Sequence, residues 1–210
     1  MKNSLKTLVT SAMTAIILSA TVFSSIAAEK VVPVVAASAK MDIKRVIVQG
    51  NTRVHLVQSK NEWVSVEESE MDKISVKQMG NTLTVSSSEE SPVTVTVYVK
   101  DLYRISALDN SEVSTIGTFN LAYLQVILRD NAVAHIKANT ESMYTDMDGL
   151  GSLELAGTTE SHTIKNSGLG SLKTEKLAAL RTDNLPVESR LAMNVMKAKV
   201  KKANTGDVKK

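Results

Sequence analysis

Apolar and polar residues alternate with period two between Ile43 and Lys100. Successive side chains of a β-strand point to opposite faces, so this alternation predicts strands that bury one face. β-branched residues fill these segments, as a pleated surface favours. Turn-forming residues around Gly50, Ser59, Gly80 and Glu90 interrupt them. The predicted strands are IKRVIVQ, TRVHLVQ, EWVSVEE, ISVKQ, TLTVSSS and VTVTVYVK.

After Leu102 the apolar pattern has a longer period. Val113, Val133, Leu153 and Leu172 follow one another at steps of 20, 20 and 19 residues. Each is preceded by a small polar cluster, in order DNSE, RDNA, GLGS and GLGS. A fixed period of this length predicts an all-β solenoid in which about 20 residues form each turn and the polar clusters form its corners.

The pentapeptide GLGSL occurs twice, at 149–153 and at 168–172. Glycine adopts positive φ without steric cost, and Asn or Asp tolerates it, so both kinds of residue suit tight corners. We expect the two copies to lie on neighbouring turns. Leu150 would then stack on Leu169, and Leu153 on Leu172.

The stretch from Leu121 to Ala138 contains good helix formers but is better explained as strand. Leu124, Val126 and Leu128 recur with period two, and an Asp-Asn pair follows them. The end of the chain is ambiguous. Leu191 continues the 19-residue step from Leu172, whereas Val187, Leu191 and Val195 fit one face of a helix. Residues 186–210 are therefore either a terminal turn or a basic tail.

The first 28 residues have the pattern of a cleaved secretory signal. Lys2 and Lys6 precede an apolar stretch from Leu8 to Ile26, and small residues close it at Ala27 and Ala28. Several Ser and Thr residues dilute the apolar stretch, which argues against a membrane anchor. We expect an exported protein, periplasmic or extracellular at the cell surface, with residues 29–41 as a linker and 42–185 as the folded domain.

Charge and cysteine content narrow the possible partners. Removing Lys2 and Lys6 lowers the formal net charge from +3 to +1, which does not suit a nucleic-acid-binding protein. Because the chain has no cysteine, it can form neither disulfides nor a thiol-linked lipid anchor. No second apolar run of membrane length follows the leader, so we expect no span in the mature chain. The lysine-rich end from Lys197 could contact a polyanion.

A search for catalytic and cofactor chemistry gives no site. His55, His135 and His162 are isolated, with no second histidine at metal-pair spacing. TDMDG resembles a calcium loop, but its twelfth position is Leu155, which leaves only a looser site through Asp146 and Asp148. Nucleophile and phosphate-loop motifs are absent. We therefore predict no catalytic residue, no cofactor-binding residue and no metal ligand.

Aromatic residues, which often form sugar-binding platforms, are few and dispersed. We do not favour a carbohydrate platform, although Tyr98 lies on the polar side of its strand. After removal of the leader the aromatic residues are Trp63, Tyr98, Tyr103, Phe119, Tyr123 and Tyr144.

The strand series from IKRVIVQ to PVTVTVYVKDLYRISALDNSEV, with the repeats after it, resembles the GIN-domain family, the "putative auto-transporter adhesin head domains". The resemblance covers roughly Met41 to Leu185. It implies an exported protein, mainly of Gram-negative bacteria of the Bacteroidetes type, folded as a right-handed solenoid of stacked β-strands. Members have no established activity. The Asp-Asn corners and the lysine tail depart from the glycine-rich corners common in the family.

Two functions remain open. The first, which we prefer, is a non-catalytic envelope or surface module that binds an unidentified ligand through a long solenoid face. The second is a polysaccharide-acting enzyme on a β-helix scaffold. An enzyme would require acidic and basic residues that converge from neighbouring turns. The pairs to test join Arg129, Lys165 or Lys173 with Asp109, Asp130 or Asp148.

Overall fold

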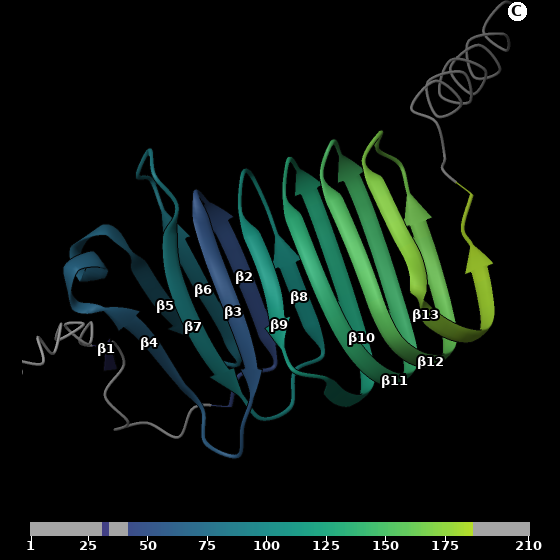
Figure 1. Cartoon of the computed structure of the whole chain (residues 1–210), viewed down its shortest axis with the longest axis horizontal. Coiled ribbons are helices and arrows are strands. Elements are labelled where there is room, and N and C mark those ends of the chain that lie inside the picture. Colours follow the sequence, from purple (N-terminus) through teal and green to yellow (C-terminus); the bar gives the residue numbers. More distant parts are fainter. Residues whose placement is uncertain (1–30, 34–41, 187–210) are drawn as a thin grey trace, which may run out of the picture.

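A computed structural model describes residues 31–33 and 42–186 of the chain. The fold is all-β: one sheet of 13 strands curls into an open half-barrel, with its strands side by side along the long axis (Figure 1). The strands are β1 (Val31–Pro33), β2 (Arg45–Gly50), β3 (Thr52–Gln58), β4 (Trp63–Glu67), β5 (Ser75–Met79), β6 (Thr82–Ser87), β7 (Val93–Val99), β8 (Arg104–Ala107), β9 (Glu112–Ile116), β10 (Phe119–Asp130), β11 (Val133–Gly149), β12 (Ser152–Asn166) and β13 (Ser171–Asn184).

All six strands predicted before Lys100 are confirmed, as β2 to β7. The segment between β4 and β5 forms a 3-10 helix, Glu68–Lys73, that the alternation did not indicate. Within the stretch expected to be a linker, β1 pairs antiparallel with β4. The expected leader and the segment 187–210 lie outside the described residues.

In the N-terminal half, the strands divide between the two sides of the curl. β2 pairs in parallel with β6 and β8, whereas β3 pairs in parallel with β7 and β9. The turn at Gly50 therefore carries the chain around a corner, from one side of the curl to the other. Gly50 has a φ of 68°, and a Cβ there would lie 2.0 Å from the carbonyl oxygen of Ser87, so only glycine fits this turn.

In the C-terminal half, long strands pair in parallel at a nearly constant offset. Phe119 of β10 lies opposite Ala138 of β11, which lies opposite Gly157 of β12. These steps of 19 residues match the period expected from the sequence. Between β12 and β13 the offset changes from 19 to 20, because β13 has a bulge near the point where Ala156 faces Lys176.

The repeat predicts that Val133 aligns with Val113 and Leu153, but the register does not place it opposite either residue. Val113 lies opposite Ala134, Ala134 opposite Leu153, and Leu153 opposite Leu172. The step from Val113 to its partner is thus 21 residues. Since a shift of one residue turns a side chain to the other face of a sheet, Ala134 is buried and Val133 lies on the outward side.

The two GLGSL segments are neighbouring corners, but their first leucines are exposed. Leu150 is 68% and Leu169 90% exposed, so the expected stacking of these side chains is wrong. The corners approach each other through backbone instead: the Leu169 amide donates to the Gly149 carbonyl oxygen at 2.8 Å. A Cβ on Gly151 would lie 2.1 Å from the Ala132 carbonyl oxygen. This close approach explains the repeated glycines.

The Asp-Asn corners follow the expectation of positive φ. Asp109 and Asp130, which begin these corners, have φ of 59° and 57°. Each accepts a backbone hydrogen bond from the corner before it, from the Gly50 amide to Asp109 and from the Asp109 amide to Asp130. The aspartates therefore form a chain of contacts along the corners.

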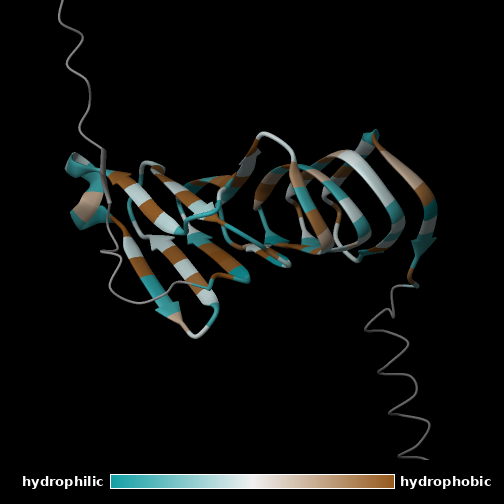
Figure 2. Cartoon of the chain, turned by 90° about the horizontal axis from the view of Figure 1, so that it is seen from below, coloured by the Kyte–Doolittle hydropathy of each residue, from teal (hydrophilic) through white to brown (hydrophobic). Residues whose placement is uncertain are grey.

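The core fills the inside of the curl, where the inward side chains of β2 to β13 meet. Alternate hydrophobic and hydrophilic bands run along the strands (Figure 2). Leu124, Val126 and Leu128 of β10 are at most 2% exposed, which confirms strand for this segment. With alternate side chains committed to the core, the intervening ones form an outer surface on each side of the curl.

Candidate binding face

One outer surface carries polar side chains in a straight row across six strands. We call this surface, formed by the outward side chains of β7, β3, β9, β11, β12 and β13, the outer face. The backbone register places the members of the row opposite one another. They are, in order, Thr96, His55, Ser114, His135, Glu154 and Lys173.

The local sequence explains why these residues point outward. Each directly follows a residue that packs in or against the core, so alternation turns its side chain to the other face. Ala134 and Ile136, on either side of His135, are at most 2% exposed. Leu153 and Leu155, on either side of Glu154, are fully buried.

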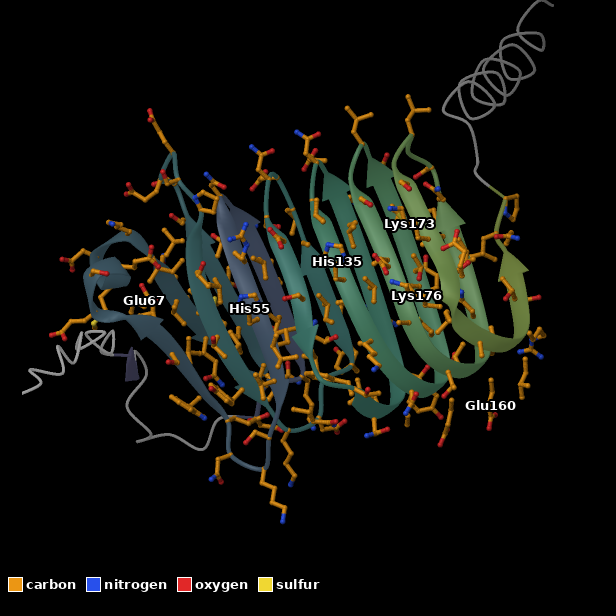
Figure 3. The ribbon with its side chains drawn as sticks, viewed as in Figure 1. His55, Glu67, His135, Glu160, Lys173 and Lys176 are labelled. Carbon is orange, nitrogen blue, oxygen red and sulfur yellow. The ribbon has the colours of Figure 1, made fainter. Side chains whose placement is uncertain are left out.

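The C-terminal end of the row contains a cluster of opposite charges. The Lys176 Nζ donates to a Glu154 carboxylate oxygen at 2.6 Å, and the His135 Nδ1 lies 3.5 Å from the other oxygen. The hydrogen bond from Lys176 lowers the pKa of Glu154, and the same bond raises the pKa of Lys176. Figure 3 shows His135 on β11, and Lys173 and Lys176 on β13, with β12 between them.

A shallow depression of about 470 Å³ lies at this cluster. Small residues from β12 line it beside the charged side chains. The lining residues are Thr115, His135, Ile136, Lys137, Glu154, Ala156, Gly157 and Lys176. Such a surface can bind a ligand by polar contacts, but it does not enclose one.

The bulge in β13 turns Lys176 toward the depression, which Lys137 of β11 also lines. Lys173 lies opposite Glu154 and Lys176 opposite Ala156, three positions further along β13 rather than two. The extra residue turns both lysines outward while Leu172 and Leu177 still pack against the core. Bulges often redirect side chains in this way.

The N-terminal part of the outer face is internally paired. His55 Nδ1 and Ser114 Oγ are 2.7 Å apart, and the Arg53 Nε donates to Glu112 at 2.9 Å. Trp63 of β4 and Tyr98 of β7 stack with ring centroids 4.1 Å apart. The polar groups of this part thus satisfy one another, whereas the C-terminal part has excess cations.

The three histidines occupy different environments. His55 and His135 lie on the outward, polar side of their strands. His162 instead points into the core, where its Nε2 lies 2.9 Å from the Thr145 hydroxyl. Burial lowers the pKa of His162.

The structure brings together other charged residues than the pairs named from sequence. Arg129 and Lys165 both contact Asp146, at 3.1 and 3.7 Å. Asp148 faces Arg129 in register but is exposed, and Lys173 lies beside Glu154. Because Arg129 contacts both carboxylate oxygens of Asp146, this group is a fixed ion pair.

The looser calcium site through Asp146 and Asp148 gains no support from this arrangement. Two cations contact the Asp146 carboxylate, which is 11% exposed. Within 31–33 and 42–186, no three His, Cys, Asp or Glu side chains gather as metal ligands.

Sequence reasoning did not identify the cluster of His135, Glu154, Lys173 and Lys176. A signal was present, because His135, Glu154 and Lys173 follow one another at the 19-residue step of the repeat. That step was applied to apolar residues alone. Lys176 could not be found in this way, since the bulge changes its offset.

Comparisons with known proteins agree on the fold. The family described as "Putative auto-transporter adhesin, head GIN domain" matches residues 42–208. A "putative adhesin" of Parabacteroides distasonis is similar in structure, with 16% identity, a TM-score of 0.53, and 74% of this chain and 76% of that one covered. One from Parabacteroides merdae has 15% identity, a TM-score of 0.50, and coverages of 74% and 75%. No curated protein matches the chain significantly.

The described residues include no helix that could cross a membrane.

Proposed function

Because the chain belongs to the family of GIN domains described as "Putative auto-transporter adhesin, head GIN domain", we propose that it is an exported, non-catalytic binding module of the cell envelope or surface. In this proposal its strands wind as a right-handed β-solenoid and its outer face contacts the ligand. The observation that carries the proposal is the in-register polar row from Thr96 to Lys173.

A row of this kind favours binding over catalysis. Neighbouring strands are about 4.8 Å apart, so the row offers one polar side chain at each step of that length. Many weak, evenly spaced contacts suit an extended partner. Catalysis instead needs a nucleophile or acid and base held about a reacting atom in a site that limits water, and the depression is shallow.

Export is supported by the sequence of the leader. We propose cleavage near Ala28, a folded domain at 42–185, and a basic tail or a further turn at 186–210. N-terminal sequencing of the exported chain tests the cleavage. A mature chain that still begins at Met1 would contradict it.

The absence of cysteine from the whole chain allows a direct test of the outer face. Ser152 and Thr163 both lie on β12, with buried Leu153 and His162 as their respective neighbours. Ser152 points to the outer face, and Thr163 to the opposite side of the curl. Ser152→Cys and Thr163→Cys would each be coupled to a maleimide polyethylene glycol.

The binding of both labelled proteins to a panel of intact bacterial and animal cells would then be measured. We expect the label at Ser152 to abolish binding and the label at Thr163 to preserve it. Equal loss from both labels, or no binding by the unlabelled protein to any cell, would contradict the proposal.

A polysaccharide-acting enzyme is the second candidate, favoured by one observation. His135 and Glu154 come from neighbouring strands and meet beside the depression, as an acid and base pair would. Incubation with acidic and neutral polysaccharides, followed by size analysis, separates the two functions. Shortened chains that disappear with Glu154→Gln would support the enzyme.

A further inference from the structure

We propose that the depression between β9 and β13 binds a carboxylate-bearing polysaccharide, whose acidic groups contact Lys137, Lys173 and Lys176 while its hydroxyls contact Glu154. This inference rests on the proposed function and names the ligand class of the same face. Its support comes from the order of charges, from the floor of the depression, and from the spacing of the strands.

Positive groups flank the central carboxylate of Glu154, and the exposed Glu175 lies near Lys176 on β13. Lys137 lies on β11, Glu154 on β12, and Lys173 and Lys176 on β13. Lys176 contacts Glu154, whereas Lys137 and Lys173 are exposed on either side of it. With strands about 4.8 Å apart, the cations on β11 and β13 are separated by roughly two strand spacings. Separated cations fit a chain with separated anions.

The central Glu154 decides against a densely charged polymer. A phosphate chain placed across β11, β12 and β13 would bring its charges against this carboxylate, which is repulsive at short distance. An ionised carboxylate only accepts hydrogen bonds. A ligand segment over Glu154 must therefore present donors, and sugar hydroxyls are such donors. A polymer of acidic sugars provides hydroxyls and isolated carboxylates together.

The floor of the depression suits the apolar face of a sugar ring. The small Ala156 and Gly157 leave the floor open, and no bulkier residue fits at Gly157 because a Cβ would lie 2.1 Å from the Ala138 carbonyl oxygen. Ile116 at the end of β9, next to the lining residue Thr115, is 54% exposed. An apolar floor with a few charged groups is the usual composition of a small-ligand site.

Isothermal titration calorimetry with oligogalacturonate as the probe tests the proposal. Methyl-esterified oligogalacturonate lacks the charges and dextran oligomers lack the carboxyl groups, so both serve as ligand controls. We expect binding of oligogalacturonate alone, weakening with salt. Equal binding of the methyl ester would overturn the role assigned to the lysines.

A matched pair of triple variants locates the site. Lys137→Gln, Lys173→Gln and Lys176→Gln together should weaken binding by roughly tenfold or more, since charge-assisted hydrogen bonds are lost. Lys60→Gln, Lys73→Gln and Lys77→Gln together remove the same charge from exposed positions elsewhere. This second triple should leave the affinity unchanged. An equal loss from both triples would show a general charge effect and overturn the site.

The outcome also separates this inference from the proposed function. Cell binding that is blocked by the label at Ser152, without any affinity for oligogalacturonate, would overturn the ligand class and keep the binding face. Affinity for oligogalacturonate, together with cell binding that the label at Ser152 does not block, would overturn the proposal that the outer face contacts the ligand. Unchanged circular dichroism of both triples excludes misfolding as the cause of a loss.

Discussion

The N-terminal and C-terminal halves of the sheet build the same curl in two ways. Before β10, each side of the curl has its own short strands, of three to seven residues, and turns join the two sides. From β11 to β13, single strands of 14 to 17 residues continue around the bend, whereas β9 and β10 together cover the two sides. Continuous strands keep one register across both sides, which is why the repeat is regular only in the C-terminal half (Figure 1).

The core also differs between the halves. The inward side chains of β2, β3, β6 and β7 are almost all Val or Leu and are at most 1% exposed, apart from Thr52 and Ser87 at the strand ends. Inward positions of β11 and β12 include Thr140, Thr145, Thr159 and His162, which hydrogen-bond in pairs, as between Thr140 and Thr159 at 2.9 Å. Apolar residues therefore make up a larger share of the inward positions in the N-terminal half. The C-terminal half combines a weaker core with the charged part of the outer face.

The largest expected effect follows from this difference in burial. Leu56→Ala removes a fully buried side chain of β3 and should lower the free energy of unfolding by about 2–5 kcal/mol. Leu172→Ala, on partly buried β13, should cost less than half as much because solvent already reaches the site. Urea unfolding measures both, and equal losses would contradict the proposed difference between the halves.

Corner glycines give the next largest effect. Gly151→Ala forces apart two stacked corners of the C-terminal half and should cost about 3 kcal/mol. Gly80→Ala, in the N-terminal half, has open space around it but a φ of 57°, so we expect only about 1 kcal/mol from backbone strain. Thermal unfolding of both variants gives the order; a more harmful Gly80→Ala would refute close approach as the cause.

The buried His162 should make the C-terminal half sensitive to acid. Its folded pKa is lowered by burial, so the unfolded state binds the proton more readily. Stability contributed by the neutral ring is complete above the unfolded pKa of about 6.5 and falls below it, by up to about 1.4 kcal/mol per pH unit. Urea unfolding at pH 7.5 and pH 5 should show a loss that His162→Gln reduces and His55→Gln does not. An unchanged loss in His162→Gln would assign the pH dependence to other groups.

The smallest expected effect concerns ion pairs. Their coupling should be stronger in the C-terminal half, whereas the effect of apolar burial should be larger in the N-terminal half. Arg53 and Glu112 are 42% and 36% exposed, so their coupling should be about 0.5 kcal/mol. Arg129 and Asp146 are 32% and 11% exposed and bond through two oxygens, and they should couple more strongly. Double-mutant cycles compare the two pairs. Stronger coupling of Arg53 with Glu112 would count against burial as the deciding factor.

Strands could be predicted from sequence, but their partners could not. The alternation around Val54 and Leu56 specifies one buried face, yet it contains no information that β3 lies between β7 and β9. The period of the C-terminal half was predictable because continuous strands impose it. The exposure of Leu150 and Leu169 was not, since it depends on how closely glycine backbones approach.

The candidate site was predictable only in part. His135, Glu154 and Lys173 could have been aligned by the 19-residue step, because parallel strands in constant register place such residues side by side. Lys176 joins them through a bulge between Glu154 and Ala156 that no sequence pattern marked. The depression itself arises from the small side chains of Ala156 and Gly157, and their significance depends on their neighbours.

Lysine acetylation of the unmodified protein, followed by mass spectrometry, tests most directly whether the outer face of β11 to β13 is the binding surface. The rates at Lys137, Lys173 and Lys176 would be compared with those at Lys60, Lys73 and Lys77, with and without oligogalacturonate. We predict slower acetylation of the first three alone when the oligosaccharide is present. Equal slowing at all six, or protection confined to the second three, would contradict the binding face. No slowing at any of the six would overturn the ligand class.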